Sequence, residues 1–115
     1  MAITEAYTNS ATIGTTEYSL PNNSTTPASI SDAGVYQVFL DLNNLVAGDQ
    51  FEIRIKEKAT SGGTQRLAFL SVVEYIQSSP IWVSPSLILM NGWDVTITKT
   101  AGTDRSISWS IRKVA

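Results

Sequence analysis

The sequence contains no cysteine and no histidine among its 115 residues. Without cysteine there can be no disulfide, thiolate metal site or thiol nucleophile. Without histidine the chain lacks the commonest metal ligand and the side chain best suited to proton transfer near neutral pH. No stretch approaches the roughly 18 apolar residues of a membrane span. We therefore expect a soluble protein that is not an enzyme, needs no cofactor or metal, and has neither a membrane nor a small-molecule ligand among its partners.

The first residues, MAITEAYTNS, lack the basic and apolar regions of a secretory signal, so we expect synthesis in a cytoplasm. A chain of 115 residues is long enough for one buried core. The net charge is −2, but residues 1–50 hold five acids and no base, whereas residues 51–115 hold eight bases and five acids. These halves can pair within one chain or between copies. The bases are scattered among acids and the pI is near 4.9, so we expect no nucleic-acid partner.

Short runs of strand-favouring residues, separated by Gly, Pro, Asn, Asp and Ser, indicate an all-β fold. Residues 51–56 alternate strictly, which places Phe51, Ile53 and Ile55 towards a core. Residues 35–42 are apolar on both sides, which is typical of a strand covered on both faces in a sandwich interior or a subunit contact. A turn at 61–64 predicts a hairpin, and the apolar strand that follows at 66–76 is a candidate interface strand.

The C-terminal half adds further strands. Residues 80–85 are bracketed by prolines and predict an edge strand. Residues 93–98 and 107–111 both alternate and are joined by a turn at 101–104, which predicts a hairpin. In the first of these strands, alternation points Asp94 outward. The expected inward residues there are Trp93, Val95 and Ile97.

The N-terminal residues are more polar, so residues 1–20 are interpreted as an arm or a first strand, with a possible strand at 11–20. Residues 21–31 read as a loop. We expect residues 21–115 to form a single β-sandwich domain or jelly roll, with about eight antiparallel strands in the whole chain. The pattern does not distinguish a sandwich from a closed barrel.

Paired carboxylates could catalyse hydrolysis without histidine. Glu52 and Glu57 are separated by an odd number of positions, so in a regular strand they point to opposite faces. Asp41 and Asp49 flank a turn and could bind a cation, but the loop lacks the ligand density of a calcium motif. We interpret both as solvated turn acids.

Aromatic and apolar residues on polar segments are the candidate partner contacts. Trp82 lies between two prolines, where it could be a core residue, an interface hot spot or a platform for a sugar. Apolar residues of the N-terminal segment also need a surface to cover them. The predicted partner-binding residues are Ile3, Tyr7, Ile13, Tyr18 and Trp82.

Two runs, GVYQVFLDLNNLVAGDQFEIRIKEKA (34–59) and SPSLILMNGWDVTITKTAGTDRSISWSIRKVA (84–115), resemble small structural proteins encoded near the capsid genes of tailed bacteriophages. The opening ATIGTTEYSL (11–20) is similar to their N-terminal strand. The resemblance implies a capsid decoration (cement) protein that binds the major capsid protein as a homotrimer on the virion surface, after synthesis in the host bacterial cytoplasm. It carries over no functional residue. The alternatives are a carbohydrate-binding or receptor-binding module, and a head–tail connector or tail protein.

Overall fold

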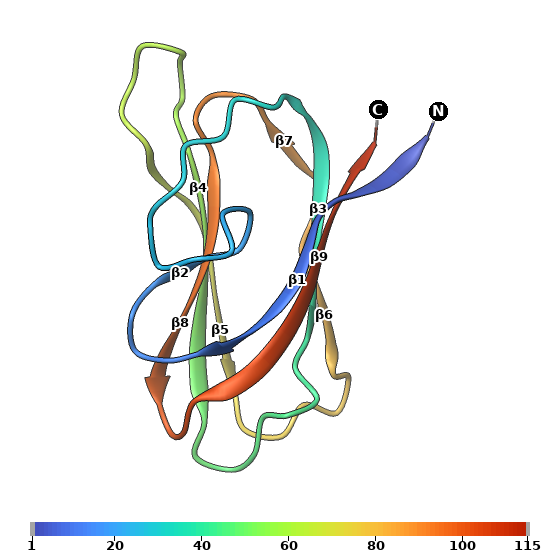
Figure 1. Ribbon diagram of the computed structural model, residues 1–115, viewed down its shortest axis with the longest axis vertical. Helices are drawn as coiled ribbons and strands as arrows, with labels where there is room; N and C mark the ends of the chain where they lie inside the picture. Colours follow the sequence, from blue (N-terminus) through green and yellow to red (C-terminus); the bar gives the residue numbers. More distant parts are fainter. Residues whose placement is uncertain (1, 115) are drawn as a thin grey trace.

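In the computed structural model, the alternating runs of the sequence form nine β-strands among the described residues, in two antiparallel sheets packed face to face (Figure 1). The structure describes residues 2–114. The protein is a single-domain β-sandwich, so the predicted fold class is confirmed. The strands are β1 (Ile3–Ile13), β2 (Tyr18–Ser19), β3 (Gly34–Asp41), β4 (Gln50–Glu57), β5 (Arg66–Glu74), β6 (Ile81–Val83), β7 (Leu87–Leu89), β8 (Asp94–Ala101) and β9 (Arg105–Val114).

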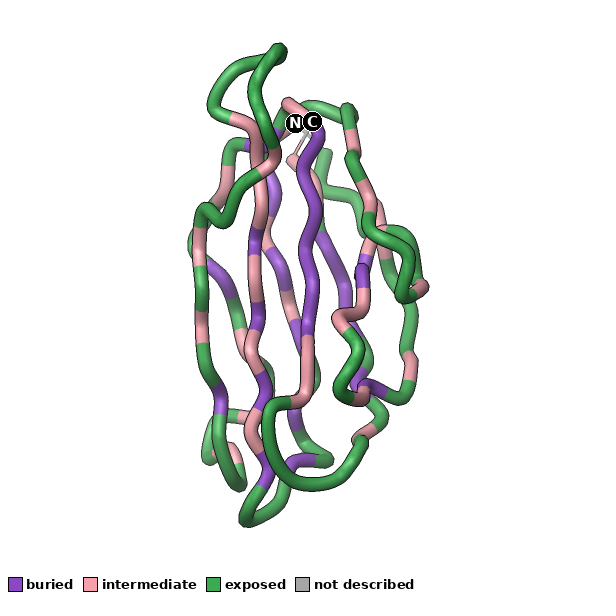
Figure 2. Tube along the Cα trace, turned by 90° about the vertical axis from the view of Figure 1, so that its left-hand side faces the viewer, coloured by how far each residue is buried: buried purple, intermediate pink, exposed green. Residues whose placement is uncertain are grey.

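The first sheet has five strands in the order β1, β9, β3, with β6 and β7 following one another along the remaining edge of β3. The second sheet has four strands in the order β2, β8, β4, β5. The β4–β5 hairpin, predicted from the turn at 61–64, is confirmed, and its loop projects beyond the sandwich as an exposed tip (Figures 1 and 2). The described residues include no helix that could cross a membrane.

The core lies between the two sheets. Phe51, Ile53 and Ile55 of β4 are fully buried, as their alternation predicts, because every second side chain of a strand points to the same face. Figure 2 shows the same alternation as buried segments separated by less buried ones along the central strands. The facing sheet contributes Tyr36, Val38 and Leu40 from β3 and Ile107, Trp109 and Ile111 from β9.

β3 is not covered on both faces within the chain. Its residues Tyr36 and Val38 are fully buried, but Val35 is 39% exposed and Phe39 is half-buried. The interpretation of this strand as sandwich interior is therefore wrong for its outer side, which lies on the molecular surface. The apolar residues of that side require another explanation.

The predicted hairpin of β8 and β9 is wrong. β8 pairs with β2 and β4, whereas β9 pairs with β1 and β3, so the chain crosses from one sheet to the other between Ala101 and Arg105. Both strands still turn their apolar residues to the same core. Alternation alone cannot distinguish such a crossover from a hairpin, because both arrangements bury the same side chains.

A buried carboxylate holds this crossover. Asp49 is 1% exposed and accepts hydrogen bonds from the amides of Val46 (2.9 Å) and Thr103 (3.1 Å). Its Oδ2 also accepts a bond from Nε of Arg105 at 2.7 Å. Asp49 thus ties the β3–β4 loop to the crossover and to the start of β9. The interpretation of Asp49 as a solvated turn acid is wrong, because the crossover covers it.

Asp94 was expected to point to solvent, but it is completely buried. The outer side of β8 at Asp94 is covered by the segment that follows β2 and carries Ala28. The Asp94 carboxylate accepts hydrogen bonds from the Ser19 hydroxyl (2.7 Å), the Ala28 amide (3.1 Å) and the Val95 amide (2.9 Å). Alternation failed here because both faces of the first half of β8 are buried.

Asp94→Ala is expected to destabilise the protein by about 2 kcal/mol, because three donors lose their acceptor in a buried place. The change should raise amide hydrogen exchange most at Ala28, whose amide loses its only side-chain acceptor. Burial raises the pKa of Asp94 above 3.8. Folding therefore favours the protonated carboxyl, so the contribution of Asp94 to the free energy of unfolding is complete below pH 3.8. This contribution falls as the pH rises through the higher folded-state pKa. Unchanged hydrogen exchange at the Ala28 amide would contradict a stabilising hydrogen bond from this amide to Asp94.

The N-terminal segment lies in the five-stranded sheet as its edge strand. β1 pairs with β9 from Ile3 opposite Val114 to Ile13 opposite Arg105, with a bulge between Glu5 and Tyr7. The strand begins and ends earlier than the possible strand at 11–20. The two ends of the described chain lie beside each other at one end of the sandwich (Figure 1).

Candidate functional site: two apolar surfaces

The predicted partner contacts of the N-terminal segment do not lie together. Ile13 is fully buried in the core, so its side chain cannot contact a partner of the folded chain. Tyr7 packs edge-on against Trp93 with ring centroids 5.6 Å apart, and Tyr18 packs against Trp109 at 6.0 Å. Both tyrosines therefore contribute mainly to packing within the chain. Ile3 is 71% exposed.

Trp82 is partly buried and packs against the core. It lies in β6, the edge strand predicted from its flanking prolines, opposite Leu40 of β3. Directly opposed residues share one face of a sheet, so Trp82 points to the same side as the buried Leu40. Its neighbours Ile81 and Val83 point to the outer side and are 52% and 46% exposed.

The outer side of the five-stranded sheet carries a row of apolar side chains across four strands. Register places Ile3 of β1 opposite Val114 of β9, Val114 opposite Val35 of β3, and Val35 opposite Ile88 of β7. Ile3 is 71% and Ile88 is 80% exposed. Residues so aligned stand side by side on one surface. We call this surface the β3–β9 face, and it also includes Phe39, Ile81, Val83 and Arg112.

Arg112 stacks on the ring of Phe39 in the middle of the β3–β9 face. The guanidinium carbon of Arg112 lies 3.8 Å from the centre of the Phe39 ring, which is a cation–π contact. Nε of Arg112 also donates a hydrogen bond to the Ser110 hydroxyl at 3.3 Å, and this hydroxyl donates to Glu5 at 2.6 Å. Arg112 is therefore held flat on the sheet, and its exposed side is available to a partner.

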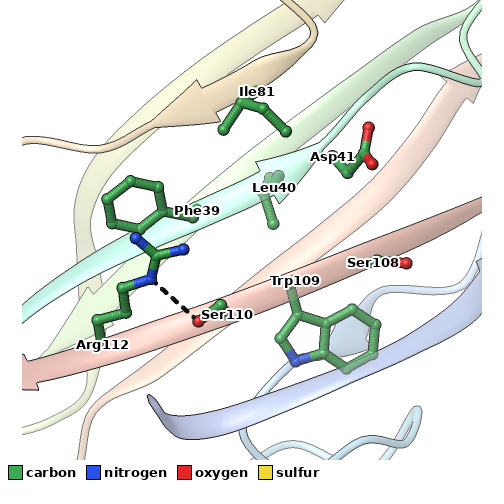
Figure 3. Close-up of a pocket in the computed structure, with 8 residues that line it drawn as sticks. All are labelled: Phe39, Leu40, Asp41, Ile81, Ser108, Trp109, Ser110 and Arg112. Carbon is green, nitrogen blue, oxygen red and sulfur yellow. Dashed lines mark hydrogen bonds between the residues drawn. The ribbon is translucent and has the colours of Figure 1, made fainter. Parts of the chain in front are cut away.

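Beside this pair the face is hollowed. Figure 3 shows Phe39, Ile81 and Arg112 around a shallow depression between β3 and β9, where Ser108 and Ser110 are the small residues. The lining combines apolar surface with one carboxylate, Asp41, and two hydroxyls. Such a depression suits a protruding side chain of a protein partner, because apolar hot spots seat in pockets of this kind.

A second apolar surface lies on the other sheet. In β5, Leu67, Leu70 and Val72 are 51%, 45% and 46% exposed, and they share the outer side of the sheet with Lys56, Arg54 and Glu52 of β4. We call Leu67, Leu70 and Val72 the β5 stripe. Residues 75 and 76, just beyond the strand, are also exposed.

A polar hollow under the 20–33 segment contains Glu17, Lys56, Asp94 and Thr96 among its lining. Nζ of Lys56 lies 2.8 Å from Glu17, and the Thr96 hydroxyl donates to the same carboxylate at 2.5 Å. Lys56 and Glu17 thus pair with each other, and Asp94 is satisfied by the three donors described above. Within residues 2–114 no group of three or more Asp and Glu side chains could hold a metal ion.

The charges of the two halves meet within the chain. Ion pairs join Lys56 to Glu17, Arg105 to Asp49 and Lys113 to Asp32. These pairs support the interpretation in which the acidic and basic halves neutralise each other intramolecularly. The ends of β5, Arg66 and Glu74, take part in none of the ion pairs among the described residues.

Sequence reasoning identified Ile3 of the β3–β9 face but missed the others. The available signal was the apolar content on both sides of residues 35–42 and 66–76. It predicted that these two strands could lie in a contact, but not which of their residues lie on the surface. No protein-family model, no curated protein and no solved structure matches the chain.

Proposed function

We propose that the protein is a structural component of a phage virion that attaches to the capsid through the β3–β9 face and catalyses no reaction. The apolar row of Ile3, Val114, Val35 and Ile88 carries the proposal. A water-exposed row of this kind gains free energy when a partner covers it, and exposed apolar patches on rigid scaffolds mark contact surfaces. The likeness to phage structural proteins supports the capsid as the partner and the homotrimer as the form that binds.

Arg112, which is held in place on the face, can orient a partner by hydrogen bonding to it. Its guanidinium is already stacked on Phe39 and bonded to Ser110, so little side-chain entropy is lost when it meets an acceptor. Arginine and aromatic residues are the commonest hot spots of interfaces. A decoration protein present in many copies needs only modest affinity at each contact, since attachment of an oligomer multiplies the contacts.

The test uses undecorated capsids of the tailed phage that the proposal implies as the source of this chain. The double variant Val35→Asp and Ile88→Asp is expected to lower capsid affinity at least about tenfold, because two charges enter the centre of the apolar contact. Binding is measured by cosedimentation, and folding is checked by thermal melting.

Thr12→Asp is the matched control. Thr12 is exposed on the same outer side of the sheet, opposite Ser106, and lies outside both the apolar row and the depression. It should bind like the unchanged protein. Equal capsid binding by the double variant would refute attachment through the β3–β9 face, and absence of binding by the unchanged protein would refute the capsid as partner.

The glycan-binding alternative receives less support from the position of Trp82. Its ring lies on the side of Leu40 and is partly buried, which leaves little of it for stacking on a sugar. A connector or tail role would use the same apolar face, and the number of copies in a particle would distinguish it from decoration.

A further inference from the structure

The turn between β7 and β8 contains an asparagine followed directly by a glycine. The chain has six asparagines, at positions 9, 22, 23, 43, 44 and 91, and only Asn91 precedes a glycine. A backbone amide can attack the side-chain carbonyl carbon of the preceding asparagine and close a five-membered ring, because both groups are held within one molecule. A side chain on the attacking residue hinders this closure, and Gly92 has none. Asn91 is therefore the asparagine of this chain best suited to the reaction.

The two reacting groups of this turn are not engaged elsewhere. Among residues 2–114 the Asn91 side chain forms no hydrogen bond, and the Gly92 amide donates none. The side chains of Asn22, Asn23 and Asn44 are each held by a hydrogen bond. Asn91 is half-buried, so water reaches the turn.

Lys58 stabilises the form of Gly92 that reacts. The nucleophile is the deprotonated amide nitrogen, whose negative charge is shared with the carbonyl oxygen of Asn91 through the peptide bond. The backbone amide of Lys58 donates a hydrogen bond to this oxygen at 3.1 Å. The Lys58 side chain lies over Gly92, since a Cβ built on Gly92 would be 2.9 Å from Cε and 3.2 Å from Nζ. A hydrogen bond and a positive charge at these places both favour ionisation of the amide.

Glu57 also faces this turn, but its negative charge is dispersed. Its Oε1 accepts hydrogen bonds from the amides of Lys58 and Asn91, both at 3.0 Å, and its Oε2 accepts one from the Met90 amide at 2.7 Å. These three donors weaken the repulsion between Glu57 and an ionised amide at Gly92. The Lys58 ammonium, in contrast, forms no ion pair among the described residues, so its charge acts on the turn undiminished.

We propose that Asn91 and Gly92 form a self-modification site, at which Lys58 promotes the conversion of asparagine to aspartate and isoaspartate. The Gly92 nitrogen loses its proton to hydroxide and bonds to Cγ of Asn91. The Cγ–Nδ2 bond then breaks, and the leaving nitrogen takes a proton from water and departs as ammonia. Water opens the resulting cyclic imide. Its addition at Cγ gives an aspartate, and its addition at the main-chain carbonyl gives an isoaspartate, whose main chain is one carbon longer.

The isoaspartate should disturb the turn, because the turn has close neighbours. A Cβ built on Gly92 would lie 2.6 Å from Oγ of Ser29. Trp93, the next residue, exchanges two backbone hydrogen bonds with Ile30, at 2.9 and 3.0 Å. One more carbon in the main chain moves these groups out of register. The isoaspartate form should therefore show faster hydrogen exchange at the amides of Trp93 and Ile30, and should melt about 5 °C lower.

Incubation of the purified protein in warm, mildly alkaline buffer tests the site. Proteolysis and mass spectrometry identify which asparagine has lost its amide, and an isoaspartate methyltransferase assay detects the isoaspartate. Asn91 should account for nearly all of the modification, and its rate should rise about tenfold per pH unit because the ionised amide is the nucleophile. Faster modification of another asparagine, or a rate that does not depend on pH, would refute the proposal. The reaction needs only the chain and water, so its outcome is independent of capsid attachment.

Lys58→Met tests the promotion of the reaction by the positive charge. The variant keeps an aliphatic side chain over Gly92, and it should slow the modification of Asn91 about fivefold. Arg54→Met is the matched control, because it removes a positive charge from the same strand away from the turn, and its rate should equal that of the unchanged protein.

The dependence on Lys58 should disappear in denaturant, because Lys58 meets Gly92 only in the folded chain. Thermal melting checks that both variants fold. Equal rates for folded Lys58→Met and the unchanged protein, or a difference that persists after unfolding, would overturn the role of Lys58.

Discussion

Asp49→Ala is expected to destabilise the protein by about 3 kcal/mol and to lower its melting temperature by about 10 °C. The side chain is 1% exposed, and its removal leaves the amides of Val46 and Thr103 and the guanidinium of Arg105 without their acceptor. Denaturant unfolding followed by tryptophan fluorescence measures the loss.

Asp104→Ala is the matched control for this substitution. Asp104 lies on the same crossover and forms an ion pair with Lys99 at 2.6 Å, but its side chain is 54% exposed. Exposed pairs contribute at most about 1 kcal/mol. If Asp49→Ala cost no more than Asp104→Ala, the buried carboxylate would not be what holds the crossover.

Asp49 also affects how the stability of the protein depends on pH. The hydrogen bond and charge of Arg105 lower the pKa of Asp49 from 3.8 to about 2. The contribution of Asp49 is therefore present above pH 3.8 and is lost as the pH falls through about 2. Asp49→Asn, which cannot ionise, should flatten the stability profile between these values in acid denaturation curves.

Gly102→Ala should cost about 3 kcal/mol, a loss similar to that of Asp49→Ala. Gly102 has φ of +88°, a conformation that residues with a side chain rarely adopt. A Cβ atom at this position would also lie 2.6 Å from Cα of Asp49 and 2.8 Å from the carbonyl oxygen of Gly48. Both contacts are with backbone, which cannot move aside without opening the crossover.

Gly62→Ala provides the comparison, because a Cβ there meets no atom within 4 Å. It should change the melting temperature little, whereas Gly102→Ala should lower it by about 10 °C. Similar melting temperatures for the two variants would show that the crossover tolerates a side chain and that its geometry is not fixed by Gly102.

The sequence predicted the sandwich because alternation reports which side chains are buried. Phe51, Ile53 and Ile55 illustrate this, since each is fully buried as expected. Alternation does not report which strand lies next to which. The β8–β9 crossover was missed for that reason, since its direction depends on Asp49, a residue more than fifty positions away from Arg105 in the chain.

Burial was mispredicted where a loop covers a sheet. Asp94 looked like an outward residue between inward neighbours, but the segment carrying Ala28 lies over it and supplies a hydrogen bond. No local pattern in the sequence indicates that a polar, Ser/Thr-rich stretch will pack on the outer side of β8. The three acceptor contacts of Asp94 compensate for its burial.

The candidate surfaces were missed in part for a related reason. Register is needed to align Ile3, Val114 and Val35, which are far apart in the chain, into one row. Two of the predicted contacts, Tyr7 and Tyr18, instead pack on buried tryptophans. An apolar residue on a polar segment therefore indicates that something covers it, but the cover here belongs to the same chain.

The position of β9 in the middle of its sheet constrains the order in which the chain can fold. β9 lies between β1 and β3, so neither neighbour gains its main partner until residues 105–114 have been synthesised. Pairings between such distant segments close slowly, because the entropy of a long loop is lost before any contact forms. During translation β1 must wait as an unpaired strand, and its many Ser, Thr and Asn residues keep it soluble over that interval.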